Sequence, residues 1–168
     1  MFDQFLHSNI NTRTDSYGGS IEGRAKFLLE LVDALAGEIG ANNLAVRLEP
    51  ACVYQGTRGE KRVETWSYIC EQFAEKYSEG EKKLSYVHFI EPRFDRIDKE
   101  GEKEAFYKSW SAEKVDNEVF KGIVKAKDIP VLSCGGWSDA NAHEAREKGW
   151  DGVVFAKWFA SNPDLPER

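Results

Sequence analysis

The sequence lacks any long hydrophobic run, because no apolar stretch approaches the roughly 18 residues that indicate a membrane-spanning helix. Cysteine is scarce: only Cys52, Cys70 and Cys134 are present, far apart and without a CxxC pair. This usage argues against a disulfide framework and favours a reducing, cytoplasmic environment. The first residues have neither the basic nor the apolar region of a signal peptide, in agreement with that expectation.

An excess of positive charge is also missing. The 168 residues contain 23 Lys and Arg against 29 Asp and Glu, which gives a net charge of −6. Such a protein is poorly suited to neutralise nucleic-acid phosphates, so no nucleic-acid partner is expected. With 41% hydrophobic and 31% charged residues, the composition is that of an ordinary globular protein, and the length suits one domain.

Four short apolar runs have the length of strands and are almost continuous in hydrophobicity, which is typical of parallel strands buried on both faces. They cover residues 44–48, 86–90, 129–133 and 152–156. Segments with helical spacing of apolar residues lie before and between them, at 21–39, 64–77, 117–126 and 138–148. The alternation predicts an α/β fold with four parallel strands and right-handed βαβ connections. A (β/α)8 barrel needs about 250 residues, so a chain of this length would hold only half of one.

The densest local signal is the polar string NINTRTDSYGGSIEGR at residues 9–24. Its paired glycines permit unusual backbone angles, and Ser20 is placed to cap the helix that follows. On composition alone, the string is explained by a well-capped turn with an internal Arg–Asp pair.

The string also resembles the old yellow enzyme family, FMN-dependent NAD(P)H oxidoreductases and ene-reductases built on a TIM barrel. The matching residues are Gln4, Phe5, Leu6, Asn11, Arg13, Asp15, Tyr17, Gly18, Gly19, Ser20 and Arg24. Later segments agree in order and spacing: VRLEP at 46–50, YVHFIEPR at 86–93, PVLSCGG at 130–136 and SNPDL at 161–165. The resemblance covers nearly the whole chain, and fungal members are the most similar.

The resemblance implies the C-terminal half of a (β/α)8 TIM barrel, a single partial domain over residues 1–168 that is truncated at both ends relative to the family. The family's substrate-binding His and Asn (or His) pair and its proton-donating Tyr lie upstream of the matched region. No catalytic residue is therefore expected in this chain. The uncovered strands are expected to self-associate or to bind an N-terminal half-barrel partner.

Arg47 stands inside an apolar strand, where a buried unpaired charge is costly. It is therefore either an exposed residue near the strand end or the partner of a ligand. The resemblance matches it to the arginine that reaches the flavin pyrimidine and stabilises negative charge on the reduced ring. A guanidinium suits that role because it is always charged and has several fixed donors.

The resemblance places the FMN phosphate at the loops after the third and fourth strands, with Gly135 and Gly136 in one loop and Ala156 and Lys157 in the other. For the glycine pair an ordinary strand-to-helix turn is the alternative. The family usually has Gly-Arg where this chain has Ala156-Lys157. The added methyl group and the point charge of lysine predict weaker phosphate binding.

Three aromatic residues are candidates for substrate contact. Tyr54 matches a position where the family has an aromatic over the substrate, and local packing in a loop explains it equally well. Phe94 and Trp137 are weaker candidates of the same kind. His88, in the middle of a strand, is predicted to be a satisfied core residue. The spacing of His and Cys supports no metal site.

By resemblance, the full enzyme passes a hydride from NAD(P)H to FMN and then to the β-carbon of an α,β-unsaturated carbonyl compound. This chain is expected to carry part of the FMN site and to show little or no turnover alone. The alternative is a non-catalytic half-barrel module that acts through self-association or weak phosphate or FMN binding.

Overall fold

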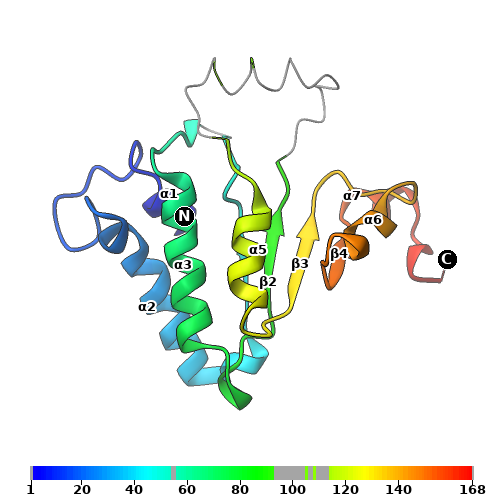
Figure 1. Ribbon diagram of the computed structural model, residues 1–168, viewed down its shortest axis with the longest axis horizontal. Coiled ribbons are helices and arrows are strands. Elements are labelled where there is room, and N and C mark those ends of the chain that lie inside the picture. Colours follow the sequence, from blue (N-terminus) through cyan, green and yellow to red (C-terminus); the bar gives the residue numbers. More distant parts are fainter. Residues whose placement is uncertain (1, 54–55, 93–104, 106–107, 109–113, 168) are drawn as a thin grey trace.

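The structure, a computed structural model, describes residues 2–53, 56–92, 105, 108 and 114–167 (Figure 1). The strands are β1 (Ala45–Leu48), β2 (Tyr86–Ile90), β3 (Val131–Cys134) and β4 (Gly152–Val154). The helices are α1 (Phe2–Leu6), α2 (Ile21–Ile39), α3 (Arg62–Lys76), α5 (Asn117–Lys125), α6 (Ala142–Glu147) and α7 (Lys157–Ser161), with 3-10 turns at Ala41–Asn43, Gly80–Lys82 and Leu165–Glu167. None of these helices has the length and apolarity needed to cross a membrane.

The four strands form one parallel sheet in the order β1-β2-β3-β4, so neighbours in sequence are neighbours in space. This confirms the predicted α/β fold with four parallel strands. Side chains alternate between the two faces of the sheet. Val46, Val87 and Val131 are in register on the first face, and Arg47 and His88 are in register on the second. Within the described residues β1 and β4 each pair on one side only, which leaves two free edges.

The first face of the sheet packs against α3 and α5, which lie side by side with α2 in Figure 1. Phe89 of β2 is fully buried there, with its ring 6.1 Å from those of Phe120 and Trp150. The core also contains Val46, Leu48, Trp66, Ile69, Phe73, Val87, Val124 and Val131. The hydrophobic runs that predicted the strands therefore bury one face against amphipathic helices. The predicted burial on both faces is seen in β2 but not in the other strands, because β1 exposes Arg47 on the second face and β3 and β4 are only partly buried.

The helix limits agree with the sequence pattern at α2, where the Ser20 hydroxyl accepts the N–H of Gly23 (3.1 Å) and Gly40 ends the helix at φ 82°. The predicted start of the fourth helix at Ser138 is wrong, because α6 begins at Ala142. Asn141 turns its side chain back to accept the N–H of Ser138 (2.7 Å), so the residues before Ala142 form a separate turn. The short helices α1 and α7 were not predicted, since five residues are too few to show a period.

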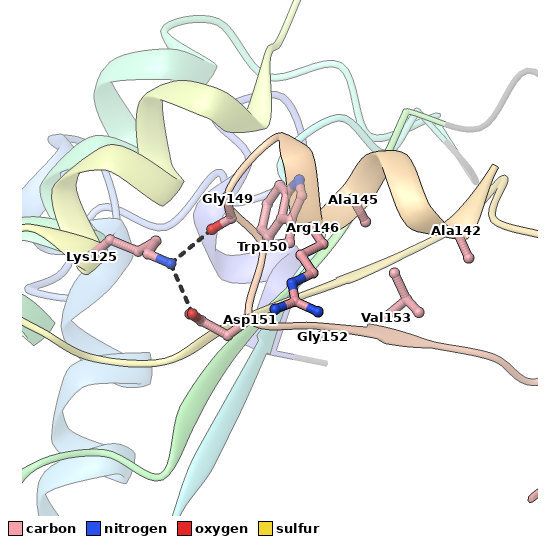
Figure 2. Close-up of a pocket in the computed structure, with 9 residues that line it drawn as sticks. All are labelled: Lys125, Ala142, Ala145, Arg146, Gly149, Trp150, Asp151, Gly152 and Val153. Atoms are coloured by element: carbon pink, nitrogen blue, oxygen red, sulfur yellow. Dashed lines mark hydrogen bonds and ion pairs between the residues drawn. The ribbon is translucent and has the colours of Figure 1, made fainter.

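Asp151 joins three elements at the N-terminal ends of β3 and β4, as Figure 2 shows in part. Its carboxylate accepts from Lys125 Nζ (2.8 Å) and from the backbone N–H of Val131 (2.8 Å). Lys125 also donates to the carbonyl of Gly149 (2.7 Å). Burial alone would raise the pKa of Asp151, but the bonds from Lys125 and Val131 outweigh it and lower the pKa.

Replacing Asp151 with alanine is expected to lower the free energy of unfolding at pH 7 by about 1–2 kcal/mol, because two donors lose their acceptor. The folded protein holds the pKa of Asp151 below its usual value. The stabilisation that Asp151 provides is therefore present at neutral pH and is lost as the pH falls through the folded pKa. Urea unfolding at pH 7 and pH 3 measures both effects. Asp139→Ala, at an exposed position, is the matched control. Equal midpoints for the two variants at pH 7 would contradict the expectation.

Candidate functional site

The 9–24 string builds the turn that precedes α2. Asn11 Nδ2 donates to the carbonyls of Phe5 (2.8 Å) and Tyr17 (2.7 Å), which ties the turn to α1. Arg13 pairs with Asp15 on the surface. A Cβ at Gly18 would lie 2.1 Å from the carbonyl oxygen of Arg13, so only glycine fits there. The capped turn with an internal Arg–Asp pair, inferred from composition, is what the chain forms.

Arg47 occupies the third position of β1 and its side chain is exposed on the second face of the sheet. No hydrogen bond or ion pair of its guanidinium is formed with the described part of the chain. Its neighbour in register is His88 of β2. The side chain is exposed near the strand end, and this position agrees with the ligand alternative as well, because its five N–H donors have no partner among the described residues.

His88 is buried, with 7% of its surface exposed, but it is not satisfied as predicted. Its Nε2 atom is buried and has no hydrogen-bond partner among the residues that the structure describes. Burial lowers the pKa of His88, and the positive charge of Arg47 lowers it further. The imidazole is therefore neutral at neutral pH.

We expect His88 to make the protein less stable as the pH falls below about 6.5, the usual pKa of histidine. Because the folded state binds this proton less readily than the unfolded chain, the loss begins near that pH and levels off below the folded pKa. His88→Gln should flatten the change in unfolding free energy between pH 7 and pH 5. Urea titrations at three pH values measure the slope, with the exposed His143→Gln as matched control. An unchanged slope in His88→Gln would contradict the assignment.

The loops after β3 and β4 lie next to each other. Trp158 of α7 donates its indole N–H to the carbonyl of Trp137 (2.9 Å), which joins the two loops directly. Gly135 and Gly136 have φ values of 103° and 78°. Neither glycine N–H donates a hydrogen bond within the described ranges. The structure thus brings together the two loops that were predicted to bind the phosphate. The sequence analysis did not predict the role of Trp158 in joining them, because a single tryptophan in a short segment gives no sequence signal.

Ala156 and Lys157 form the second of these loops. Ala156 has φ −126°, a conformation that does not require glycine, so the alanine causes no backbone strain there. Lys157 is exposed, with Nζ 5.4 Å from the centre of the Trp158 ring. It has no carboxylate partner among the described residues. Its charge is therefore available to an anion.

Gly135 and Gly136 also line a groove of about 610 Å³. Its charged lining is mostly acidic and consists of Glu91, Asp116, Glu118, Glu144 and Lys148. Four carboxylates against one ammonium repel a phosphate. The groove carboxylates therefore disfavour a phosphate, whereas the N–H groups of the two glycines, which have no acceptor within the described ranges, and the charge of Lys157 favour one.

Trp137, the one aromatic candidate that lies within the described residues, is not brought together with Arg47. Trp137 donates its indole N–H to Ser133 Oγ (2.8 Å), and Ser133 is a fully buried residue on the first face. This places the Trp137 indole beside the opposite face of the sheet from Arg47. Tyr54 and Phe94 lie outside the described residues. In the described ranges no three His, Cys, Asp or Glu side chains are grouped as metal ligands.

Comparison with known proteins identifies the family to which the chain belongs. The sequence model of the NADH:flavin oxidoreductase / NADH oxidase family matches residues 1–168. Flavin oxidoreductase hxnT of Emericella nidulans is 38% identical over 169 residues, which are 100% of this chain and 43% of that protein. The 12-oxophytodienoate reductase 2 of Arabidopsis thaliana is 36% identical over 100% of this chain and 40% of its own length.

Among solved structures, morphinone reductase superposes with a TM-score of 0.78 at 30% identity, covering 99% of this chain and 40% of the morphinone reductase chain. Old Yellow Enzyme from Pichia sp. AKU4542 superposes with a TM-score of 0.74 at 30% identity, over 100% of this chain and 39% of that enzyme. The chain therefore spans less than half the length of the relatives it matches.

Proposed function

We propose that this chain, which belongs to the NADH:flavin oxidoreductase / NADH oxidase family, supplies part of the FMN site of an NAD(P)H-dependent oxidoreductase. One observation carries the proposal. The β3 and β4 loops are joined through Trp158, and together they offer glycine N–H groups and a Lys157 ammonium that have no hydrogen-bond or ion-pair partner within the described residues. Arg47 stands near the same end of the sheet, since the carboxyl ends of parallel strands meet at one edge.

Each residue has a role set by its chemistry. The N–H groups of Gly135 and Gly136 and the ammonium of Lys157 hold the FMN phosphate by hydrogen bonds and charge. Arg47 contacts the flavin pyrimidine and stabilises negative charge there through its fixed donors. When bound, FMN supplies the hydride chemistry that links NAD(P)H to an α,β-unsaturated carbonyl substrate.

We also propose that residues 1–168 are one partial TIM-barrel domain that needs further polypeptide to complete the site. The edges of β1 and β4 are free in the described chain, and Arg47 is exposed on the second face. Either a second copy or an N-terminal half-barrel would pair those edges and cover that face. The isolated chain is expected to show little or no turnover.

The visible absorption spectrum of the purified chain, recorded with its size-exclusion profile, tests the proposal. Flavin bands after addition of FMN are expected, either in an oligomer or after co-expression with the part of the Emericella nidulans relative that this chain does not match. A correctly assembled pair that stays colourless in excess FMN would contradict FMN binding. A yellow but monomeric chain would contradict the need for completion.

Restoring the family's residues in the second loop should strengthen phosphate binding. The double variant Ala156→Gly/Lys157→Arg is expected to bind FMN about tenfold more tightly, because a guanidinium can hold two phosphate oxygens. Riboflavin, which lacks the phosphate, should bind both proteins equally. Fluorescence titrations with the two flavins measure the difference. An unchanged FMN affinity would instead favour a non-catalytic half-barrel, the alternative that the Ala156-Lys157 departure supports.

A further inference from the structure

A series of hydrogen bonds links the ends of β2 and β3 with the loops that follow β3 and β4. Trp137 Nε1 donates to Ser133 Oγ (2.8 Å), and Ser133 Oγ donates to Glu91 Oε1 (2.8 Å). Trp158 Nε1 donates to the Trp137 carbonyl (2.9 Å). We call Glu91, Ser133, Trp137 and Trp158 the loop bridge.

The chemistry of the side chains fixes the direction of these bonds. An indole N–H can only donate, so Ser133 Oγ has to accept from Trp137. The single hydroxyl proton of Ser133 is then donated to Glu91, whose Oε1 atom is the acceptor. Ser133 is fully buried, and both partners satisfy it without water. The bridge therefore has one consistent arrangement.

The bridge holds the glycine pair from both ends. Gly135 and Gly136 lie between Ser133 and Trp137 in the sequence, and both neighbouring anchors belong to the bridge. Glu91 adds a backbone bond, because its N–H donates to the carbonyl of Cys134 (2.7 Å), directly before Gly135. Glycine loses more conformational freedom on ordering than any other residue, so these bonds fix the most flexible part of the loop.

We propose that the loop bridge consists of positioning residues that order the Gly135–Gly136 pair and hold the Lys157 loop beside it, and so set the affinity for the phosphate of FMN. This inference rests on the proposed FMN site. A loop that is ordered before binding loses little entropy when the phosphate arrives, which strengthens binding without any new contact. The Trp137 indole bonds Ser133 beside the face of the sheet opposite Arg47, so the bridge is expected to act on phosphate binding and not on the flavin ring.

Substitutions of Glu91 can change the bridge without altering the residues of the loop itself. Its carboxyl is half-buried, and burial raises its pKa, whereas the bonds with Ser133 and Asn117 oppose the rise. Glutamine at this position keeps an oxygen that accepts from Ser133 and removes the charge. Glu91→Gln is therefore the conservative variant, and Glu91→Leu removes the acceptor.

The experiment compares the dissociation constants of FMN and riboflavin and the amide hydrogen exchange of residues 135–137 and 157–159. Trp158→Phe and Ser133→Ala are expected to weaken FMN binding about five- to tenfold and to leave riboflavin unchanged. Exchange in both loops should become faster. Glu91→Gln keeps the acceptor for Ser133 and removes one groove carboxylate, so it should bind FMN at least as tightly as the wild type. Glu91→Leu, which lacks the acceptor, should bind FMN more weakly than Glu91→Gln and exchange faster in both loops. Phe159→Leu, next to Trp158 and exposed, is the matched control.

Two results would contradict the proposed role of the loop bridge. One is an equal loss of affinity for FMN and riboflavin, and the other is amide hydrogen exchange in the two loops that does not change in the variants. If the wild-type chain binds no FMN, the proposed function fails, and exchange alone then decides whether the bridge orders the loops. Trp158→Phe keeps this test valid even if Ser133→Ala does not fold, because Trp158 is only half-buried whereas Ser133 is fully buried.

Discussion

Replacing Arg24 with leucine is expected to lower the free energy of unfolding by about 3–5 kcal/mol, because several buried acceptors lose their donor at once. Arg24 is 5% exposed in α2. Its guanidinium donates to the carbonyls of Leu6 (2.9 Å) and Gly19, and to Thr65 Oγ1 (3.2 Å) of α3. One side chain thus ties together α1, the turn before α2, and α3.

Thermal and urea unfolding of Arg24→Leu measure this loss, and a fall of roughly 10 °C in Tm is expected for a chain of this size. Arg24→Lys should recover only part of the stability, since an ammonium cannot reproduce the planar fork. Arg13→Ala is the matched control from the same string. Arg13 is exposed and pairs with Asp15, so its loss should leave the midpoint almost unchanged. Similar midpoints for Arg24→Leu and Arg13→Ala would contradict the buried role of Arg24.

The fold was largely predictable because its elements follow simple periods. The apolar runs at 44–48 and 86–90 became β1 and β2 almost residue for residue, since buried parallel strands leave an uninterrupted hydrophobic signal. The start of α6 was not predictable from periodicity. It depends on Asn141 bonding back to Ser138, and such a local side-chain bond competes with helix formation.

The same residues that carry the family resemblance turned out to act in different ways. Asn11, Gly18 and Arg24 stabilise a turn and its contacts, so the most recognisable part of the sequence is structural here. Arg47, in contrast, is exposed and forms no hydrogen bond or ion pair in the described chain, and the same holds for Lys157, at a position where the chain departs from the family. A sequence motif can therefore identify a family without showing which residues of the motif contact the cofactor.

The polar bonds around the site could not be derived from the sequence. The loop bridge depends on the register of β2 and β3, which pairs Phe89 with Ser133 and so places Glu91 beyond it. The burial of His88, whose Nε2 atom has no partner in the described ranges, likewise depends on what the folded chain packs around it. The spacing of residues predicts which face of a strand a side chain occupies, but hydrogen-bond partners can be identified only from the three-dimensional structure.

Replacing Arg47 with glutamine is expected to weaken the binding of FMN and of riboflavin by the same factor, about ten- to a hundredfold. Both flavins carry the ring that Arg47 contacts in the proposed site, and the loss of a charged hydrogen bond affects them equally. Folding stability should not change, because the side chain is exposed and makes no bond within the described residues.

Parallel fluorescence titrations of the two flavins measure this loss in the assembled protein, and Arg47→Lys, which keeps the charge without the fork, is the matched control. A loss confined to FMN would place Arg47 at the phosphate instead of the ring. The comparison with the loop bridge then separates the two halves of the site: variants of the bridge change the preference for FMN over riboflavin, and variants of Arg47 do not. A chain that shows both behaviours has a divided flavin site, in which β1 serves the ring and the loops after β3 and β4 serve the phosphate.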